Sequence, residues 1–283
     1  MPDFALGHYN AQMRKVRTAA QKTLVKSSRG GAHAQAGKAE PAPQEPRRRA
    51  GQPPSQDPAR IKEIFRRFKA ANPHPKGELD HVNPYTLLVA VVLSAQSTDK
   101  GVNKATKPLF LCADTPEKML ALGEEKLRDM IKTIGFFRAK AKNVIALSER
   151  LVKDFGGVVP RSREALESLP GVGRKTANVV LNIAFGEPVI AVDTHIFRVS
   201  NRIPLAIGKT PLEVERGLDA LIPAAYKHDA HHWLILHGRY VCKSRKPDCG
   251  HCLISDLCQW PGKLAGKDET PVTERSSPAR RPG

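Results

Sequence analysis

Apolar side chains recur at helical spacing through the middle of the chain, and proline follows a capping residue where several of these segments begin. After Asp57-Pro58, apolar residues stand three and four positions apart, at Ile61, Ile64, Phe65 and Phe68. The strict alternation of apolar and polar residues that is typical of a half-buried strand never persists. The pattern therefore predicts an all-α fold of about ten or more helices, with no β-sheet of consequence.

Capping and terminating residues predict where the helices lie. The expected segments run from residue 84 to about 95, from 116 to 122, from about 138 to 155, from 163 to 168, from 174 to 185, and onward from 194 and 211. The valines of the first segment would also suit a strand, but its length and its initial proline favour a buried helix. Gly156-Gly157 can end the third segment, and Thr210 with Glu213 predicts a capping box.

Both ends of the chain are poor in large apolar residues. Residues 1–58 carry ten basic and four acidic groups, and residues 261–283 form a second polar tail. We expect a disordered basic arm at the N-terminus and a disordered tail at the C-terminus, because so few apolar side chains cannot offset the entropy of ordering. An acid-poor, basic segment also suits an organelle transit peptide, which is the alternative for residues 1–58.

Composition narrows the classes of partner. Lys and Arg total 46 against 28 Asp and Glu, a formal charge of +18, which predicts attraction to nucleic acid or to an anionic surface. The longest apolar run, residues 87–93, is far shorter than the roughly 20 residues that cross a bilayer. We therefore expect no membrane segment, and nucleic acid becomes the favoured partner.

The segment Leu169-Pro170-Gly171-Val172-Gly173 predicts a tight turn between two helices. Gly171 and Gly173 permit unusual backbone angles and leave amide groups uncovered beside the start of the second helix. Such amides bind a phosphate of the nucleic acid backbone without reading the base. The pattern is that of a helix-hairpin-helix element, and an ordinary helix–turn–helix corner is the alternative.

Lys175 falls in the first turn of the second of these helices, next to Arg174. The helix dipole and the neighbouring cation both lower the pKa of a lysine, and a neutral lysine can form a Schiff base. From the turn alone, a catalytic role of Lys175 as a Schiff-base nucleophile and a role in binding a phosphate are equally supported. Asp193 precedes an amphipathic helix and predicts an N-cap, although a carboxylate there could also stabilise positive charge on a sugar ring.

Four of the five cysteines lie within seventeen residues, spaced C-x6-C-x2-C-x5-C, at Cys242, Cys249, Cys252 and Cys258. The spacing favours an iron–sulfur cluster, while a structural zinc site stays open as the alternative. The loop between the first two cysteines contains Lys243, Arg245 and Lys246, which metal binding would hold as a basic finger for phosphates. We expect Cys112 to be a buried structural thiol.

Together, the hairpin, Lys175, Asp193 and the cysteine spacing resemble the endonuclease III family of base-excision DNA glycosylases. The resemblance covers roughly residues 59–260 and includes Leu93-Ser94-Ala95-Gln96 and residues 231–239. It implies a six-helix barrel domain with the helix-hairpin-helix over residues 77–187. It also implies a second domain, built from residues 59–76 and 188–260, that holds one [4Fe-4S] cluster, with DNA in a groove between the domains.

The resemblance further implies a bifunctional enzyme, a DNA glycosylase and abasic-site lyase that flips oxidised pyrimidines out of duplex DNA. Lys175 matches the nucleophile that forms a Schiff base, Asp193 matches the aspartate that assists it, and β-elimination then cuts the strand. Gln96 matches the residue that fills the vacated space, although it could be a surface glutamine at a helix end. Phe136 stands where relatives commonly carry a leucine wedge, and its ring can still intercalate.

These interpretations imply a monomer that acts on double-stranded DNA containing damaged pyrimidines or abasic sites in a bacterial cytoplasm, at the nucleoid. Two other classes stay in view: an adenine-mispair glycosylase, which lacks the lysine and carries a further C-terminal domain, and a non-catalytic iron–sulfur module that binds DNA. His228, His231, His232 and His237 share a predicted helix before the cysteines, and we expect them to make structural hydrogen bonds.

Overall fold

The computed structural model describes residues 57–263, which form eleven α-helices and no strand. In chain order these are α2 (Pro58–Ala71), α3 (Pro84–Ser94), α4 (Asp99–Cys112), α5 (Pro116–Leu122), α6 (Glu124–Met130), α7 (Phe137–Phe155), α8 (Arg163–Glu167), α9 (Arg174–Phe185), α10 (Thr194–Arg202), α11 (Pro211–Leu221) and α12 (Ala224–Tyr240). The all-α prediction is confirmed over this range. The predicted arm and tail lie almost wholly outside the described residues. None of the described helices combines the length and apolar character that crossing a bilayer requires.

Local signals define the ends of several helices as predicted. Asn83 opens α3 with a reciprocal pair of bonds: its side chain accepts from the Thr86 amide at 2.8 Å, and the Thr86 hydroxyl accepts from the Asn83 amide at 3.0 Å. Helix α7 ends at Gly156 in the left-handed conformation. Helix α9 begins at Arg174 and ends at Phe185, at the predicted residues.

Two local predictions need correction, and helices α4 and α6 were not predicted. The Thr210 hydroxyl accepts from the Glu213 amide, but the Glu213 carboxylate accepts from the Lys209 amide at 2.8 Å instead of closing a box on Thr210. Helix α4 was not predicted, because Pro108 in its interior interrupts the pattern. Cys112, at the end of that helix, is exposed and not a buried thiol.

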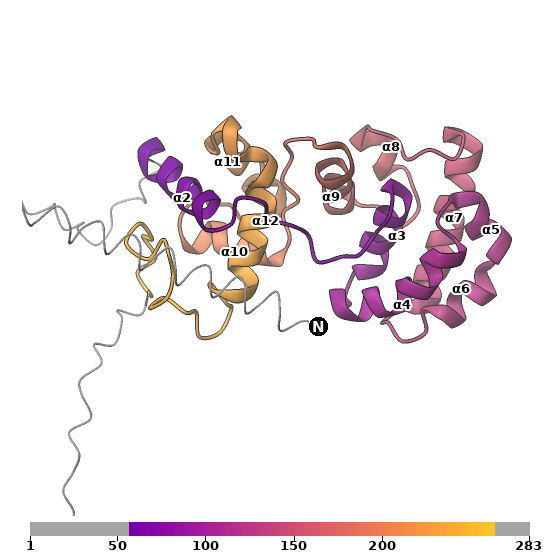
Figure 1. Ribbon diagram of the computed structural model, residues 1–283. Coiled ribbons are helices and arrows are strands. Elements are labelled where there is room, and N and C mark those ends of the chain that lie inside the picture. Colours follow the sequence, from indigo (N-terminus) through magenta and orange to yellow (C-terminus); the bar gives the residue numbers. More distant parts are fainter. Residues whose placement is uncertain (1–56, 264–283) are drawn as a thin grey trace, which may run out of the picture.

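Two hydrophobic cores lie side by side (Figure 1). The first is built from α3 to α9, and the second from α2, α10 to α12 and the segment after α12, with Trp233 at its centre. Helix α9 lies between them, and Val179 on it joins a smaller apolar cluster with Leu87 and Ala191. The helix that carries Lys175 is therefore at the boundary of the two cores.

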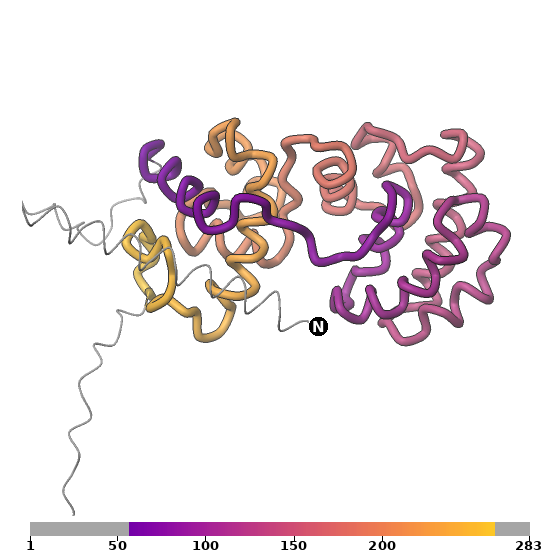
Figure 2. Tube along the Cα trace, in the orientation of Figure 1, coloured from indigo at the N-terminus to yellow at the C-terminus, as the bar shows by residue number. Residues whose placement is uncertain are grey.

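The chain crosses that boundary twice (Figure 2). Residues 72–83 lead from α2 to α3, and residues 186–193 lead back from α9 to α10. Helix α2 belongs to the second core: the buried Arg60 donates to the carbonyls of Ile203 at 2.5 Å and Leu257 at 2.7 Å. Its end is held by Trp233, which donates to the Asn72 carbonyl at 2.8 Å.

Candidate functional site

The predicted hairpin joins α8 to α9. Buried side chains of Leu169 and Val172 anchor the turn, and Gly171 adopts a positive φ of 77°. A Cβ atom on Gly171 would stand 2.9 Å from the Asn143 side-chain nitrogen, so the position also requires a residue without a side chain. Gly173 caps α9 without a side-chain hydrogen bond, and a Cβ there would meet nothing within 4 Å. The first amides of α9 are therefore open to an anionic ligand.

Lys175 is exposed in the first turn of α9. Partial desolvation lowers its pKa, the charges of Asp193 and Asp99 oppose that shift, and the cation of Arg239 adds to it. The predicted direction is confirmed, but Arg174 is not its cause. Arg174 makes a bidentate ion pair with Glu215 of α11, at 2.7 and 3.0 Å, so its charge is neutralised by that partner.

Asp193 is the N-cap of α10, as predicted. Its Oδ1 accepts from the amides of His195 at 2.9 Å and Ile196 at 2.8 Å. Both bonds use the same oxygen, and Oδ2 accepts no hydrogen bond from the described residues. The half-buried carboxylate therefore keeps one oxygen available to Lys175. Its negative charge raises the pKa of Lys175.

Sequence reasoning missed a charged network beside Lys175. Arg239, near the end of α12, is paired with both Asp99, in the first turn of α4, and Glu78, in the segment between α2 and α3. The Tyr240 hydroxyl also donates to Glu78. The network connects the two cores and adds one anion and one cation to the surroundings of Lys175. No local signal identifies these partners, because 140 and 161 residues separate them along the chain.

Gln96 and Phe136 are both exposed, Phe136 by 67% of its surface. Each adopts a left-handed backbone, with φ of 54° and 57°. The loops that carry them are adjacent, because a Cβ on Gly135 would lie 3.6 Å from the Gln96 carbonyl oxygen. The structure thus places the exposed Gln96, beyond α3, and the exposed Phe136, before α7, on adjacent surface loops.

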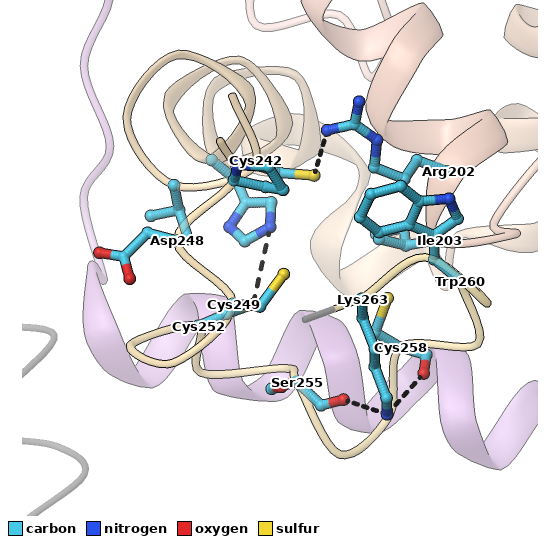
Figure 3. A pocket seen from close by; sticks show the side chains of 13 residues that line it. Arg202, Ile203, Cys242, Asp248, Cys249, Cys252, Ser255, Cys258, Trp260 and Lys263 are labelled. Carbon is cyan, nitrogen blue, oxygen red and sulfur yellow. Dashed lines mark hydrogen bonds between the residues drawn. The ribbon is translucent and has the colours of Figure 1, made fainter. Parts of the chain in front are cut away.

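The four clustered cysteines line one pocket, together with Arg202, His237 and Trp260 (Figure 3). Arg202 donates to the Cys242 sulfur at 3.6 Å, and the His237 ring nitrogen Nε2 is 4.0 Å from the Cys252 sulfur. Burial raises the pKa of Cys252 to about 12 and also raises that of Cys258, so these thiols need a metal centre to become thiolates.

The donor set around the pocket fits an iron–sulfur cluster. Four cysteine thiols are the ligands of a cubane cluster, and hydrogen bonds to its sulfurs tune it. Arg202 and His237 place N–H groups beside the sulfurs of Cys242 and Cys252.

The predicted basic finger and the histidines lie in the same half of the molecule. Lys243, Arg245 and Lys246 are exposed, and Arg202, the last residue of α10, donates to the carbonyls of Lys243 and Ser244. Their loop therefore lies at the opposite end of α10 from Asp193. The structure therefore does not bring the finger next to Lys175. His231, His232 and His237 are buried and kept neutral, since burial lowers the pKa of each, that of His237 to about 4.

Comparisons with known proteins agree with this arrangement. Residues 89–224 match the HhH-GPD superfamily base excision DNA repair protein, and residues 242–258 match the iron–sulfur binding domain of endonuclease III, which begins and ends at the first and last clustered cysteines. Endonuclease III of Haemophilus influenzae is 57% identical over 202 residues, or 71% of this chain and 96% of that protein. The Escherichia coli enzyme is 56% identical over the same shares.

Solved structures give the same result. A trapped endonuclease III–DNA covalent intermediate is 45% identical, with a TM-score of 0.67 over 71% of this chain and 95% of that one. A thermostable thymine-DNA glycosylase is 26% identical, with a TM-score of 0.65 over 71% and 96%. The expected resemblance is thus confirmed, and the chain belongs to the endonuclease III family, whose members are iron–sulfur base-excision DNA glycosylases and abasic-site lyases.

Proposed function

We propose that this chain removes oxidised pyrimidines from duplex DNA and cuts the abasic strand, with Lys175 as the nucleophile. The observation that carries the proposal is the placement of Lys175: an amine at the start of α9, with a pKa lowered by desolvation, beside the carboxylate of Asp193, whose Oδ2 accepts no hydrogen bond from the described residues. A neutral amine is the form that attacks carbon.

The proposed chemistry follows from these two residues. The target nucleotide is first turned out of the stack, at a cost of a few kcal/mol that is smaller for a damaged base. Lys175 Nζ then forms a bond to the sugar C1′ as the C1′–N bond to the base breaks. Asp193 stabilises the positive charge that develops on the sugar and takes up the proton that the amine sheds. Ring opening gives an imine between Lys175 and C1′.

The imine makes the C2′ hydrogens acidic. Loss of one of them to a base, with departure of the 3′ phosphate, cuts the strand by β-elimination, and water releases the lysine. Gln96 would occupy the space left by the flipped nucleotide, and Phe136 would separate the neighbouring bases. The open amides beyond Gly171 and Gly173 would bind a backbone phosphate. We propose the same phosphate role for Lys243, Arg245 and Lys246.

We also propose that Cys242, Cys249, Cys252 and Cys258 ligate one [4Fe-4S] cluster, which holds the basic loop in shape and takes no part in bond breaking. We propose two domains, residues 77–187 and residues 59–76 with 188–260, and the two separate hydrophobic cores support this division. We propose a monomer that works on DNA in a bacterial cytoplasm, since the relatives reported above are bacterial.

Borohydride trapping tests the proposal. Hydride reduces the imine to a stable amine, so wild-type protein incubated with abasic-site duplex and borohydride should give a covalent adduct that Lys175→Ala lacks. Lys153→Ala, which removes an exposed lysine at the far end of α7, is the matched control and should trap normally. Wild type that binds this duplex but never becomes trapped would refute the lyase and favour the non-catalytic DNA-binding module.

A further inference from the structure

Lys140 on α7 is a buried cation with an unusual partner. Only 6% of its surface is exposed, and its Nζ donates to the Ser97 hydroxyl at 2.8 Å. No described carboxylate pairs with it, and burial lowers its pKa. A buried ammonium without an ionic partner costs free energy, and such costs persist where the group has a specific use.

The Lys140–Ser97 bond joins the two loops that carry the predicted inserting residues. Ser97 directly follows Gln96, and the Lys140 amide donates to the Phe136 carbonyl at 3.0 Å. A path therefore runs from Gln96 through Ser97 and the Lys140 side chain to the first turn of α7, where the Lys140 amide bonds to Phe136.

The backbones of the inserting residues need such support. Gln96, Phe136 and Lys246 are the three non-glycine residues with positive φ between residues 57 and 263. A bulky side chain in that conformation is strained and persists only where the surroundings enforce it. A buried hydrogen bond from a charged donor, anchored in a long helix, supplies that constraint.

We propose that Lys140 is a positioning residue that holds Gln96 and Phe136 at a fixed spacing, so that both enter the duplex as one unit. The inference rests on the proposed function, because it concerns how the duplex is opened before Lys175 reacts. It assigns to a buried lysine a role in substrate opening and none in the chemistry at C1′.

The test separates duplex opening from chemistry. The substrate is a duplex with a tetrahydrofuran site, which cannot form an imine. A 2-aminopurine base stands opposite that site, and the fluorescence of this base rises when it is unstacked. In Lys140→Met and Ser97→Ala, we expect the fluorescence rise at saturating protein to fall by about tenfold. The double variant should be no worse than either single variant, because both remove the same bond. Trapping on a single-stranded abasic oligonucleotide, where nothing needs opening, should stay at the wild-type rate.

Controls make each outcome decisive. Lys142→Met removes an exposed lysine of the same helix, so an equal loss of signal in that variant would assign the effect to charge alone and overturn the proposal. Additive losses, unchanged fluorescence, or equal slowing on single and double strands would also overturn it. Should Lys140→Met fail to fold, Ser97→Ala carries the test, since it keeps the lysine. Wild type that unstacks the duplex but never traps would instead count against the proposed lyase.

Discussion

The protonation state of Lys175 depends on its desolvation and on the charges of three neighbouring residues. Desolvation and Arg239 favour the neutral amine, whereas Asp193 and Asp99 favour the ammonium. Arg239 is itself paired with Asp99 and Glu78, so its influence and that of Asp99 are linked. His231 is also affected by the charge of Lys175, and it is buried and neutral. Changing either member of the Arg239–Asp99 pair should therefore move the titration of Lys175, and in opposite directions.

We predict opposite pH shifts for Arg239→Gln and Asp99→Asn. Removing the cation raises the pKa of Lys175, so the acid limb of the trapping rate against pH should move to higher pH. Removing the anion lowers the pKa, so the limb should move to lower pH. A charge at this range is worth roughly 1 kcal/mol, or about 0.7 pH units. Single-turnover trapping across the pH range measures both limbs, and shifts of the same sign would contradict the assignment.

Asp193 serves as a cap and, we propose, as a catalytic carboxylate, and two substitutions separate these roles. Asparagine keeps the oxygen that accepts from His195 and Ile196, so Asp193→Asn should unfold at nearly the wild-type temperature. Asp193→Ala removes the cap and should lose about 1 kcal/mol of unfolding free energy. Both variants lose the charge and should trap about a hundredfold more slowly. Trapping of Asp193→Asn at the wild-type rate would show that Asp193 caps α10 and has no role in catalysis.

The hairpin can be tested as an element through its two glycines. Gly171→Ala must hold a positive φ and displace Asn143, and we expect a loss of roughly 1–2 kcal/mol in unfolding free energy. Gly173 has an ordinary extended backbone and open space around its Cα, so Gly173→Ala should fold normally while its methyl group hinders a phosphate. Thermal unfolding and duplex affinity measured together distinguish the two, and normal affinity for Gly173→Ala would remove the phosphate role.

At the scale of elements, the sequence predicts best where a cap and a periodic pattern coincide. Helices α3, α7 and α9 have all their signals within a few residues and were predicted closely. Helix α4 was missed because Pro108 obscured its pattern, although Thr98 caps it. The environment of Lys175 could not be derived locally either: Arg174, its neighbour in sequence, pairs with α11, while Arg239 and Asp99 approach only through the fold. The charges around Lys175 can be identified only from the three-dimensional structure. The metal site could be predicted from the sequence, because its four cysteines lie close together along the chain.

At the scale of the whole molecule, about a third of the net charge belongs to the N-terminal 58 residues. We predict that removing residues 1–55 leaves trapping intact at low salt but reduces the slope of log affinity against log salt, because fewer counterions are released on binding. Fluorescence anisotropy with a tetrahydrofuran duplex over a salt series measures this. An unchanged slope would show that the arm does not touch DNA.

The two crossings of the chain also set an order of events during synthesis. Helix α2 leaves the ribosome first, with Ile61, Ile64, Phe65 and Phe68 exposed, but its partners α10 to α12 follow more than 120 residues later. The core of α3 to α9 is continuous in sequence and can close in the meantime. Forming the second core then requires bringing α2 and α10 to α12 together across the whole folded first core. Closing so long a loop slows folding, and the apolar face of α2 is exposed to aggregation in the meantime. Iron can be captured only after that, because the cysteines emerge last.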